Sequence, residues 1–191
     1  MDRGPRGDRP ALMRTIDGLV FRIRSFTAAD TDELVALALR AWEPVFESMR
    51  SVLGSELFVA LRGEEWREGQ AADVKKTIGD EGARTWVAEV DRRVRGFATA
   101  ALRGGDIGEV VMVAVEPSHQ RHGLASALTE TATTWLRDRG AAVVMVETGG
   151  DRGPAVVTVE TGGDPGHAAA RATYERLGFT ASPVTRYFKK L

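Results

Sequence analysis

The chain contains no cysteine, and its 191 residues include only three histidines. The absence of cysteine excludes disulfides, thiolate metal sites and a cysteine nucleophile. The three histidines lack the spacing of a metal site, so no metal cofactor is expected. The longest apolar runs, such as VVMVAV at Val110–Val115, are too short to cross a bilayer, and no apolar h-region follows the opening MDRGPRGDRP. We therefore expect a cytoplasmic protein with no membrane partner.

The chain also lacks an excess of either charge. Its 26 Lys and Arg residues against 27 Asp and Glu give a formal net charge of -1 and a pI near 6.3. This balance provides no electrostatic footprint for a nucleic acid. With 43% hydrophobic and 28% charged residues, the composition is typical of a globular protein, and the length suffices for one domain with a full core.

The beginning of the chain differs in composition from the rest. Residues 1–18 are rich in Arg, Asp, Gly and Pro and show no apolar period, so we predict a disordered N-terminal extension. Met13 is a candidate for the natural start. Residues 19–191 are predicted to form the folded domain, and its first strand is LVFRIRSF, 19–26, in which apolar and basic residues alternate.

Helical patterns follow this strand. The first helix has Thr27 or Asp30 as its cap and is predicted to end at Pro44. A second helical region is predicted over residues 45–78, with a break near Gly63. The apolar face of the first helix comprises Leu34, Leu37 and Ala38.

Three strands, a long helix and a strand–helix–strand ending are predicted next. ARTWVAEV and RVRGFATAAL form a hairpin joined at DRR, with Gly96 as a candidate bulge, and IGEVVMVAVEP is apolar enough for burial on both faces. The long helix SHQRHGLASALTETATTWLRDRG ends at Gly140. The strand AAVVMVE, the helix HAAARATYERLG and the strand VTRYFKKL complete the chain. This order predicts a mixed α/β domain.

A near-repeat separates the last two of these strands. Residues 142–154 and 155–167 are identical at 10 of 13 positions. Two copies are too few for a solenoid, so we interpret the segment as a tandem duplication that the fold accommodates as an insertion. Residues 142–147 are predicted to occupy the sheet and residues 148–163 to protrude as a loop or hairpin. The reverse choice, with residues 156–160 in the sheet, is nearly as good.

The strand-to-helix junction VVMVAVEPSHQRHGLASAL is where we expect an anion to bind. A helix N-terminus presents unpaired backbone N–H groups and the positive end of the helix dipole. Gly123 and Ala125 place no bulk between a phosphate and the backbone. Further donors at the rim come from Gln120, Arg121 and His122. The stretch matches neither a P-loop nor the three-glycine dinucleotide fingerprint.

Two motifs resemble the GNAT superfamily of N-acetyltransferases. QRHGLA, residues 120–125, resembles its motif A, Gln/Arg-x-x-Gly-x-Gly/Ala after a strand. HAAARATYERLGF resembles the family's later helix, Asn-x-x-Ala-x-x-x-Tyr-Glu-x-x-Gly-Phe, with His167 in place of Asn. The motifs occur in the expected order, and the resemblance covers residues 20–191. It implies the GNAT acyl-CoA N-acyltransferase fold, an α/β fold whose mixed sheet has splayed central strands.

The resemblance implies acetyl-CoA as co-substrate and no metal. In the family, motif A binds the pyrophosphate, and the pantetheine arm lies between the splayed strands, where Val113 and Val115 would give backbone contacts. His167 would contact the cofactor as the family's Asn does, or merely begin the helix. The implied cofactor-binding residues are Val113, Ala114, Val115, Gln120, Arg121, His122, Gly123, Leu124, Ala125, Ser126 and His167.

The resemblance also implies an acid and a base. Tyr174 matches the family's helix tyrosine and is the candidate acid for the CoA thiolate; the alternative is that it only packs the helix against the sheet. Glu109 is the candidate base, because several family members carry a catalytic glutamate near the start of this strand. By strand alternation Glu109 is predicted to share a face with Val111, Val113 and Val115. The alternative is a strand-end residue in solvent.

The acceptor is expected beside the first two helices, which line that side of the cleft in the family. RAWEPVFESM places Trp42, Glu43 and Phe46 close together, and aromatic side chains beside carboxylates suit a cationic amine. The more ordinary alternative is that Trp42 and Phe46 belong to the core and the glutamates are exposed.

The implied function is acetyl-CoA-dependent transfer of an acetyl group to a primary amine of a small molecule or peptide, by direct attack with a general base. The alternative is a non-catalytic acyl-CoA-binding module with a sensor or regulatory role. Dimers are common in the family, so a homodimer is an expectation that rests on the resemblance alone.

Overall fold

The computed structural model describes residues 12–16, 18–102, 107–141, 143–145, 163 and 165–178. The described strands form one six-stranded sheet in the order β1-β2-β3-β4-β5-β6. Neighbours are antiparallel except for the parallel pair β5–β6. The strands are β1 Leu12–Ile16, β2 Leu19–Ser25, β3 Ala83–Val90, β4 Arg93–Leu102, β5 Ile107–Val115 and β6 Val143–Met145.

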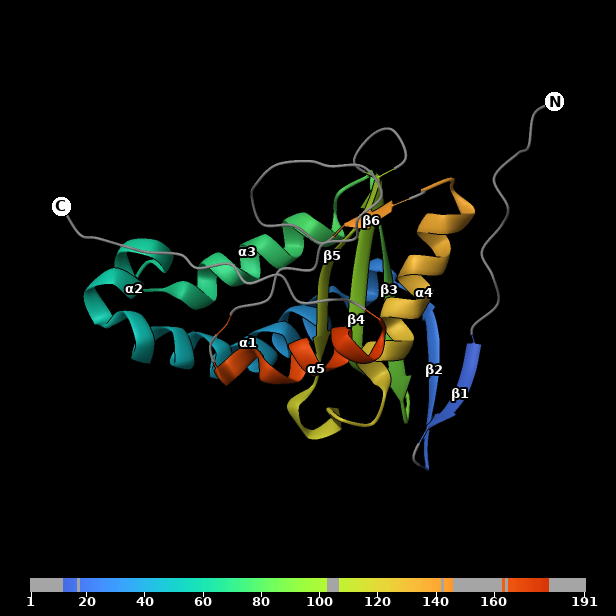
Figure 1. Cartoon of the computed structure of the whole chain (residues 1–191), viewed down its shortest axis with the longest axis horizontal. Helices are drawn as coiled ribbons and strands as arrows, with labels where there is room; N and C mark the ends of the chain where they lie inside the picture. Colours follow the sequence, from blue (N-terminus) through green and yellow to red (C-terminus); the bar gives the residue numbers. More distant parts are fainter. Residues whose placement is uncertain are drawn as a thin grey trace.

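Helices connect the strands and cover both faces of the sheet (Figure 1). The mixed α/β class and most predicted elements are confirmed, including the break near Gly63, which separates α2 from α3. The α-helices are α1 Thr31–Leu53, α2 Ser55–Arg62, α3 Trp66–Ile78, α4 Leu124–Asp138 and α5 Ala168–Arg176, and the short 3-10 helices are η1 Ala28–Asp30, η2 Pro117–His119 and η3 Pro165–His167. None of the described helices is both long and apolar enough to span a membrane.

Two apolar layers pack against opposite faces of the sheet. On one face, α4 buries Leu124, Leu128 and Leu136 against β2, β3, β4 and β5. On the other, α1 and α3 cover β3 to β5, and the predicted apolar face of α1 is fully buried there. At about 1.5–3 kcal/mol for each large apolar side chain buried, these layers supply most of the driving force for the fold.

Pro44 does not end the first helix, as the sequence predicts; α1 continues through it to Leu53. A proline inside a helix removes one backbone hydrogen bond and costs about 3 kcal/mol or more. The continuation buries Phe46, which packs edge-on against Trp66 at 4.5 Å between ring centroids and also against Phe58. Burial of this aromatic cluster is worth more than the cost of the proline, so tertiary packing overrides the local signal.

The predicted N-terminal extension contains a strand. β1 pairs antiparallel with β2, with Ile16 opposite Leu19, so the prediction of disorder is wrong for residues 12–16. The sequence signal was present: an Asp-Gly pair between alternating segments is typical of a two-residue hairpin, and Gly18 has φ +79°. Residues 1–11 lie outside the described part, so the rest of that prediction stays untested.

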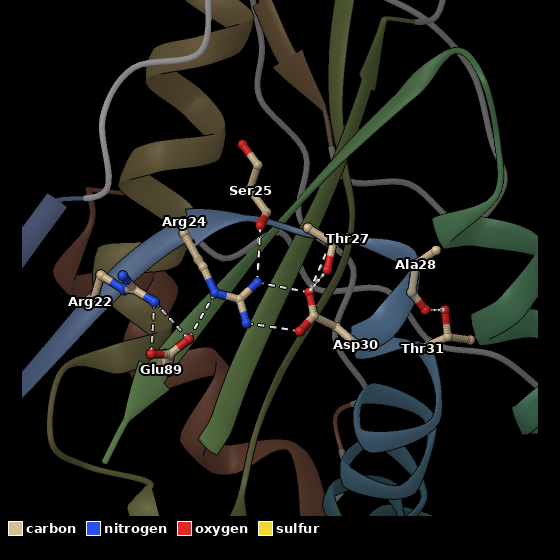
Figure 2. A network of polar contacts seen from close by, with 8 residues as sticks. All are labelled: Arg22, Arg24, Ser25, Thr27, Ala28, Asp30, Thr31 and Glu89. Carbon is tan, nitrogen blue, oxygen red and sulfur yellow. Dashed lines mark hydrogen bonds and ion pairs between the residues drawn. The ribbon is translucent and has the colours of Figure 1, made fainter. Parts of the chain in front are cut away.

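A network of charged side chains fastens the start of α1 to the sheet (Figure 2). Arg24 donates to both carboxylate oxygens of Asp30, at 2.7 and 2.8 Å, and to Glu89 at 2.8 Å; Arg22 also donates to Glu89. The Asp30 carboxylate further accepts the backbone N–H of Thr27 at 2.8 Å. The Arg24 guanidinium, outweighing the effect of burial, lowers the pKa of Asp30 from 3.8 to about 2. Asp30 is thus the residue that anchors the helix start.

Replacing Asp30 with Asn should lower the free energy of unfolding at pH 7 by about 2 kcal/mol, because the charged partner of Arg24 is lost. A carboxyl group whose pKa is lowered by folding stabilises the folded state fully at pH values above its unfolded-state pKa. This stabilisation is lost as the pH falls through its folded-state pKa. The deficit of Asp30→Asn should therefore be full above pH 4 and shrink as pH approaches 2. Urea denaturation of wild type and variant over this range measures it. Asp32→Asn, at an exposed position two residues further on, serves as the control; an equal deficit there would contradict the assignment.

The first copy of the near-repeat supplies a sheet strand. Val143–Met145 pairs parallel with residues 107–109 of β5, as predicted for residues 142–147. The predicted loop over residues 148–163 and the second copy's strand residues lie outside the described residues, except for Gly163. The closing strand VTRYFKKL lies outside them as well. The insertion hypothesis therefore stays a prediction, with its starting strand now assigned.

Deleting residues 148–160 should leave a folded protein, because β6 remains and one copy of TGGDPGH still leads into η3. Deleting residues 142–154 instead gives the same sequence except for Thr in place of Met145, so the two variants form a matched pair. Both should unfold cooperatively within a few degrees of wild type in a thermal melt. Loss of cooperative unfolding in both would show that the second copy is an essential element.

Candidate functional site

The end of β5 leads through η2 into the N-terminus of α4, which is the predicted anion site. The N–H of Ala127 donates to the carbonyl of Gly123 at 3.0 Å. This is the first helical hydrogen bond at the start of α4. The amides of residues 123–126 thus have no acceptor inside the helix. Arg121 and His122 are exposed beside them, whereas the Leu124 side chain is buried in the core and contributes only its backbone. These groups fit a phosphate or diphosphate.

Gly123 is required for a reason that differs from the predicted one. Its φ is +77° and it stands at the N-cap of α4. A Cβ at this position would lie 2.9 Å from side-chain carbons of Ile16 on β1. The missing side chain therefore makes room for Ile16, and the hairpin packs directly under the loop. Arg121 also has positive φ, +66°, an uncommon conformation for a residue with a side chain.

The Gln120 side chain makes a contact within the loop that the sequence did not predict. Its amide donates one N–H to the carbonyl of Val115 at 3.2 Å and closes the loop onto the end of β5. The amide has a second N–H. Gln120, Arg121 and His122 are all exposed, so the prediction that they donate to a phosphate stays a prediction.

The last residues of β5 turn main-chain groups away from β4. The N–H of Glu116 donates to Arg95 on β4 at 2.8 Å. Alternation along a strand then directs the N–H and C=O of Val115 and Val113 to the opposite edge. On that edge β6 pairs only with residues 107–109, as far as the described residues extend. This arrangement fits the splayed strands and leaves an edge at which an extended ligand could hydrogen-bond.

A bulge changes the face on which Glu109 lies. Met112 pairs with Thr99 and Val110 with Ala100, so Val111 is an extra residue without an opposite partner. Val110 packs in the α4 layer, while Met112 packs with α1 and α3 on the other face. Glu109, next to Val110, therefore points to the α1 and α3 face.

The predicted common face of Glu109 with Val113 and Val115 is thus wrong, because one inserted residue reverses the alternation beyond it. Glu109 is also only 8% exposed, which contradicts the alternative of a strand-end residue in solvent. Glu109 is thus a buried carboxylate on the face of the sheet that carries α1 and α3.

Tyr174 and His167 both belong to α5 and its start. His167 is the N-cap residue of α5, directly after η3, and is partly buried. Tyr174 lies one and a half turns into α5, also partly buried, and burial raises the pKa of its hydroxyl above 10. The position of α5 is set by α1, because the Gly166 N–H donates to Ser48 on α1 at 3.3 Å.

The three residues predicted to bind the acceptor lie in different environments in the structure. Phe46 is 4% exposed in the aromatic cluster, so the core alternative holds for it and it cannot contact a substrate. Trp42 is partly buried against Phe97 on β4, and Glu43 forms an ion pair with Arg67 on α3. Only Trp42 and Glu43 keep a surface that an acceptor could reach.

Sequence reasoning missed a link between α1 and the loop of residues 116–123, called the phosphate loop after the ligand predicted for it. Arg40 on α1 donates to both carboxylate oxygens of Glu116, with Nη2 to Oε2 at 2.6 Å and Nε to Oε1 at 3.0 Å. Glu116 is 8% exposed, and the Arg40 guanidinium lowers its pKa. The only local signal was a charged residue at the end of an apolar strand. Its partner lies 76 positions away, so no spacing rule could have paired them.

In the described part of the chain, no group of three or more His, Asp or Glu residues is arranged to hold a metal ion. The candidate site therefore consists of backbone amides, a strand edge, a buried carboxylate and a tyrosine. These are the parts that bind an anionic, extended ligand and move protons beside it.

Comparison with known proteins decides which family combines these parts. The family model described as the acetyltransferase (GNAT) family matches residues 42–179, from the middle of α1 to just beyond α5. The chain belongs to this GNAT family. The matched range contains the β5 strand, the phosphate loop and the Tyr174 helix, so the two sequence motifs fall where a GNAT domain carries them.

Curated relatives of this GNAT domain are longer proteins. A mycothiol acetyltransferase of Beutenbergia cavernae is 28% identical over 177 residues, covering 93% of this chain and 51% of that protein. One of Rhodococcus opacus is 29% identical over 169 residues, covering 82% of this chain and 50% of that protein. The chain thus spans about half the length of these relatives.

Solved structures confirm the GNAT fold. The aminoglycoside N-acetyltransferase AAC(6')-Iy in complex with CoA aligns with a TM-score of 0.55 at 16% identity, covering 97% of both chains. A ribosomal-protein-alanine N-acetyltransferase from Brucella melitensis aligns with a TM-score of 0.55 at 15% identity, covering 90% of this chain and 99% of that chain. At these identities the likeness concerns the fold.

Gly123→Ala should lower the free energy of unfolding by about 1–3 kcal/mol, because positive φ and the Ile16 contact both oppose a side chain. Gly140→Ala is a matched control: Gly140 has φ +88° but nothing within 4 Å of a Cβ, so it measures the backbone cost alone. Ile16→Ala in the Gly123→Ala background should recover part of the loss. Urea denaturation gives all values. Equal costs at Gly123 and Gly140 would refute the contact with Ile16 as the reason for glycine.

Proposed function

We propose that this GNAT domain transfers an acetyl group from acetyl-CoA to a primary amine of a small molecule or peptide. The observation that carries the proposal is that the edge of β5 that no described strand pairs beyond residue 109 leads along the chain to the amides at the start of α4, which have no acceptor inside the helix. A ligand with an extended amide-containing arm and a diphosphate fits this edge and these amides. The acetyl-CoA supplies the acetyl group as a thioester, with a thiol as leaving group.

The chain's own groups divide the binding work. The N–H and C=O of Val113 and the N–H of Val115 are directed to an edge that no strand pairs among the described residues, and they can hydrogen-bond an extended arm as a strand would. The amides of residues 123–126 and the positive end of the α4 dipole can hold a diphosphate. Arg121 and His122 stand exposed at its rim, and Ala125 and Ser126 are partly exposed in the first turn. His167 at the start of α5 is a further proposed contact.

Tyr174 is proposed to hold the proton that the departing thiolate needs. Burial raises its pKa above 10, so the hydroxyl stays protonated at physiological pH. A general acid must carry its proton before transfer, and this environment preserves it. The Gly166 N–H in η3, just before α5, donates to Ser48 on α1, which supports a place for α5 beside α1.

Glu109 is proposed as the base that removes a proton from the attacking amine. Its side chain is buried on the sheet face that carries α1 and α3, the face on which an acceptor is expected in this family. Trp42 and Glu43 on α1 are the proposed acceptor contacts, because an aromatic ring and a carboxylate favour a cationic amine. Phe46 is not part of this proposal, since it lies in the core.

The acceptor class is supported by the names of the relatives. The curated relatives are called mycothiol acetyltransferases, and the similar structures include aminoglycoside and ribosomal-protein-alanine N-acetyltransferases. These names favour an amine on a small molecule or a peptide. The alternative function, a non-catalytic acyl-CoA-binding module, would keep the phosphate loop but release no CoA with any amine.

A thiol-reactive dye separates the two functions, because the chain has no cysteine and gives no background. Release of CoA from acetyl-CoA that depends on an added amine supports transfer. Saturable CoA binding without release across a broad amine panel would establish the non-catalytic alternative and overturn the proposal.

Tyr174→Phe should lower kcat about 10²-fold or more, because it removes the acid without removing the ring. In the unaltered protein kcat should not fall between pH 7 and 9 through loss of the Tyr174 proton, since burial raises the pKa of the hydroxyl above its ordinary value. The dye assay over this range measures both effects, and Kd for CoA should stay the same in the variant. A variant with undiminished kcat over this range would remove Tyr174 from the mechanism.

A further inference from the structure

The junction between β5 and the phosphate loop is joined to α1 by the Arg40–Glu116 ion pair. Three N–H···O contacts of 2.6, 3.0 and 3.2 Å connect the two side chains, an arrangement typical of a strong, directional arginine–carboxylate pair. The Glu116 side chain is 10% exposed and that of Arg40 is 49% exposed. Among the ion pairs of the described residues, this is the one that connects α1 with the junction.

Glu116 fixes the loop with its backbone as well as its side chain. Its N–H donates to Arg95 on β4 at 2.8 Å, and its carbonyl accepts the N–H of His119 at 2.8 Å. Pro117 follows directly and begins η2. One residue thus ends the strand, closes the first turn of the loop and reaches across to α1.

Apart from this pair and the contact of Gly123 with Ile16 on β1, the loop is held by short-range hydrogen bonds. The Gln120 N–H donates to Pro117 at 3.4 Å, and its side chain donates to Val115 at 3.2 Å. Such contacts preserve the shape of the loop but do not set its place relative to α1. Arg95 and His119 are the other basic groups whose charges act on Glu116. The first belongs to β4 and the second to the loop, so neither connects the loop to α1.

The helix that carries Arg40 also carries the acceptor side of the candidate site. Trp42 and Glu43 follow within one turn, and Ser48, two turns on, accepts the Gly166 N–H that precedes the Tyr174 helix. α1 therefore touches the phosphate loop, the proposed acceptor contacts and the start of α5. A shift of the loop relative to α1 would change the distance between the two substrates.

We propose that Arg40 and Glu116 form a positioning pair, which holds the amides of the phosphate loop at a fixed place relative to the acceptor helix. This inference rests on the proposed function, since it concerns how the acetyl-CoA site is held. Neither side chain is a catalytic residue. Their contribution is made through the loop that follows Glu116 and through the helix that contains Arg40.

The test compares two arginines of similar exposure. Arg40→Met breaks the pair with Glu116, whereas Arg22→Met breaks the pair of Arg22, 42% exposed, with Glu89 between β2 and β3, where Arg24 still holds Glu89. Both variants should lose similar thermal stability. Calorimetric titration with CoA should show about tenfold weaker binding for Arg40→Met, or about 1.4 kcal/mol, and a change within twofold for Arg22→Met.

Conservative variants separate positioning from stability. Arg40→Lys keeps the charge but not the planar fork and should recover part of the affinity, and Glu116→Gln should lose part of it. The loss in the double variant Arg40→Met with Glu116→Gln should be smaller than the sum of the single losses. If Arg40→Met does not fold, Arg40→Lys and Glu116→Gln decide the outcome against Arg22→Met.

The two ways of failing are distinct. One outcome is that Arg40→Met and Arg22→Met bind CoA equally well and lose equal thermal stability. This result would show that the pair only stabilises the fold, and it would overturn the inference while the proposed function stands. Absence of CoA binding by the unaltered chain would overturn the proposed function together with the inference.

Discussion

The candidate site depends on the way β5 is hydrogen-bonded to β4, with one extra residue at Val111. Before the bulge, β5 pairs on both sides; after it, β6 no longer follows within the described residues. The same bulge turns Glu109 toward α1, while Val113 and Val115 direct main-chain groups to the open edge. A single irregularity in one strand pair thus decides the face on which the Glu109 carboxylate is buried.

The phosphate loop follows directly after β5, and two elements distant in the sequence hold it in position. Ile16 on β1 fills the space that Gly123 leaves, and Arg40 on α1 binds Glu116. α1 in turn begins at the Asp30 anchor on β2 and continues through Pro44 because Phe46 is buried beyond it. The helix is therefore rigid at its start and deep in the core further on, which suits an element that links the cofactor side with the acceptor side.

Much of the fold could be predicted because its signals are short-range. The alternation of β2, the helical spacing of α4 and the break at Gly63 each involve neighbours within a few residues, and the structure follows them. β1 was missed although its Asp-Gly turn was readable, because the polar composition of the preceding residues outweighed a five-residue alternation. Pro44 misled the local prediction, because a cost of about 3 kcal/mol is overcome only by aromatic packing from α2 and α3, which no local window contains.

The sequence by itself was enough to identify the family, the strand-to-helix junction and the helix that carries Tyr174. Each was identified from a short motif whose residues lie close together along the chain. Only the tertiary structure decided which face Glu109 occupies, that Phe46 is core, and that Glu116 binds Arg40. The reason is physical. A one-residue bulge inverts side-chain alternation, and a contact between residues 76 positions apart depends on how the sheet and α1 pack, which local periodicity does not encode.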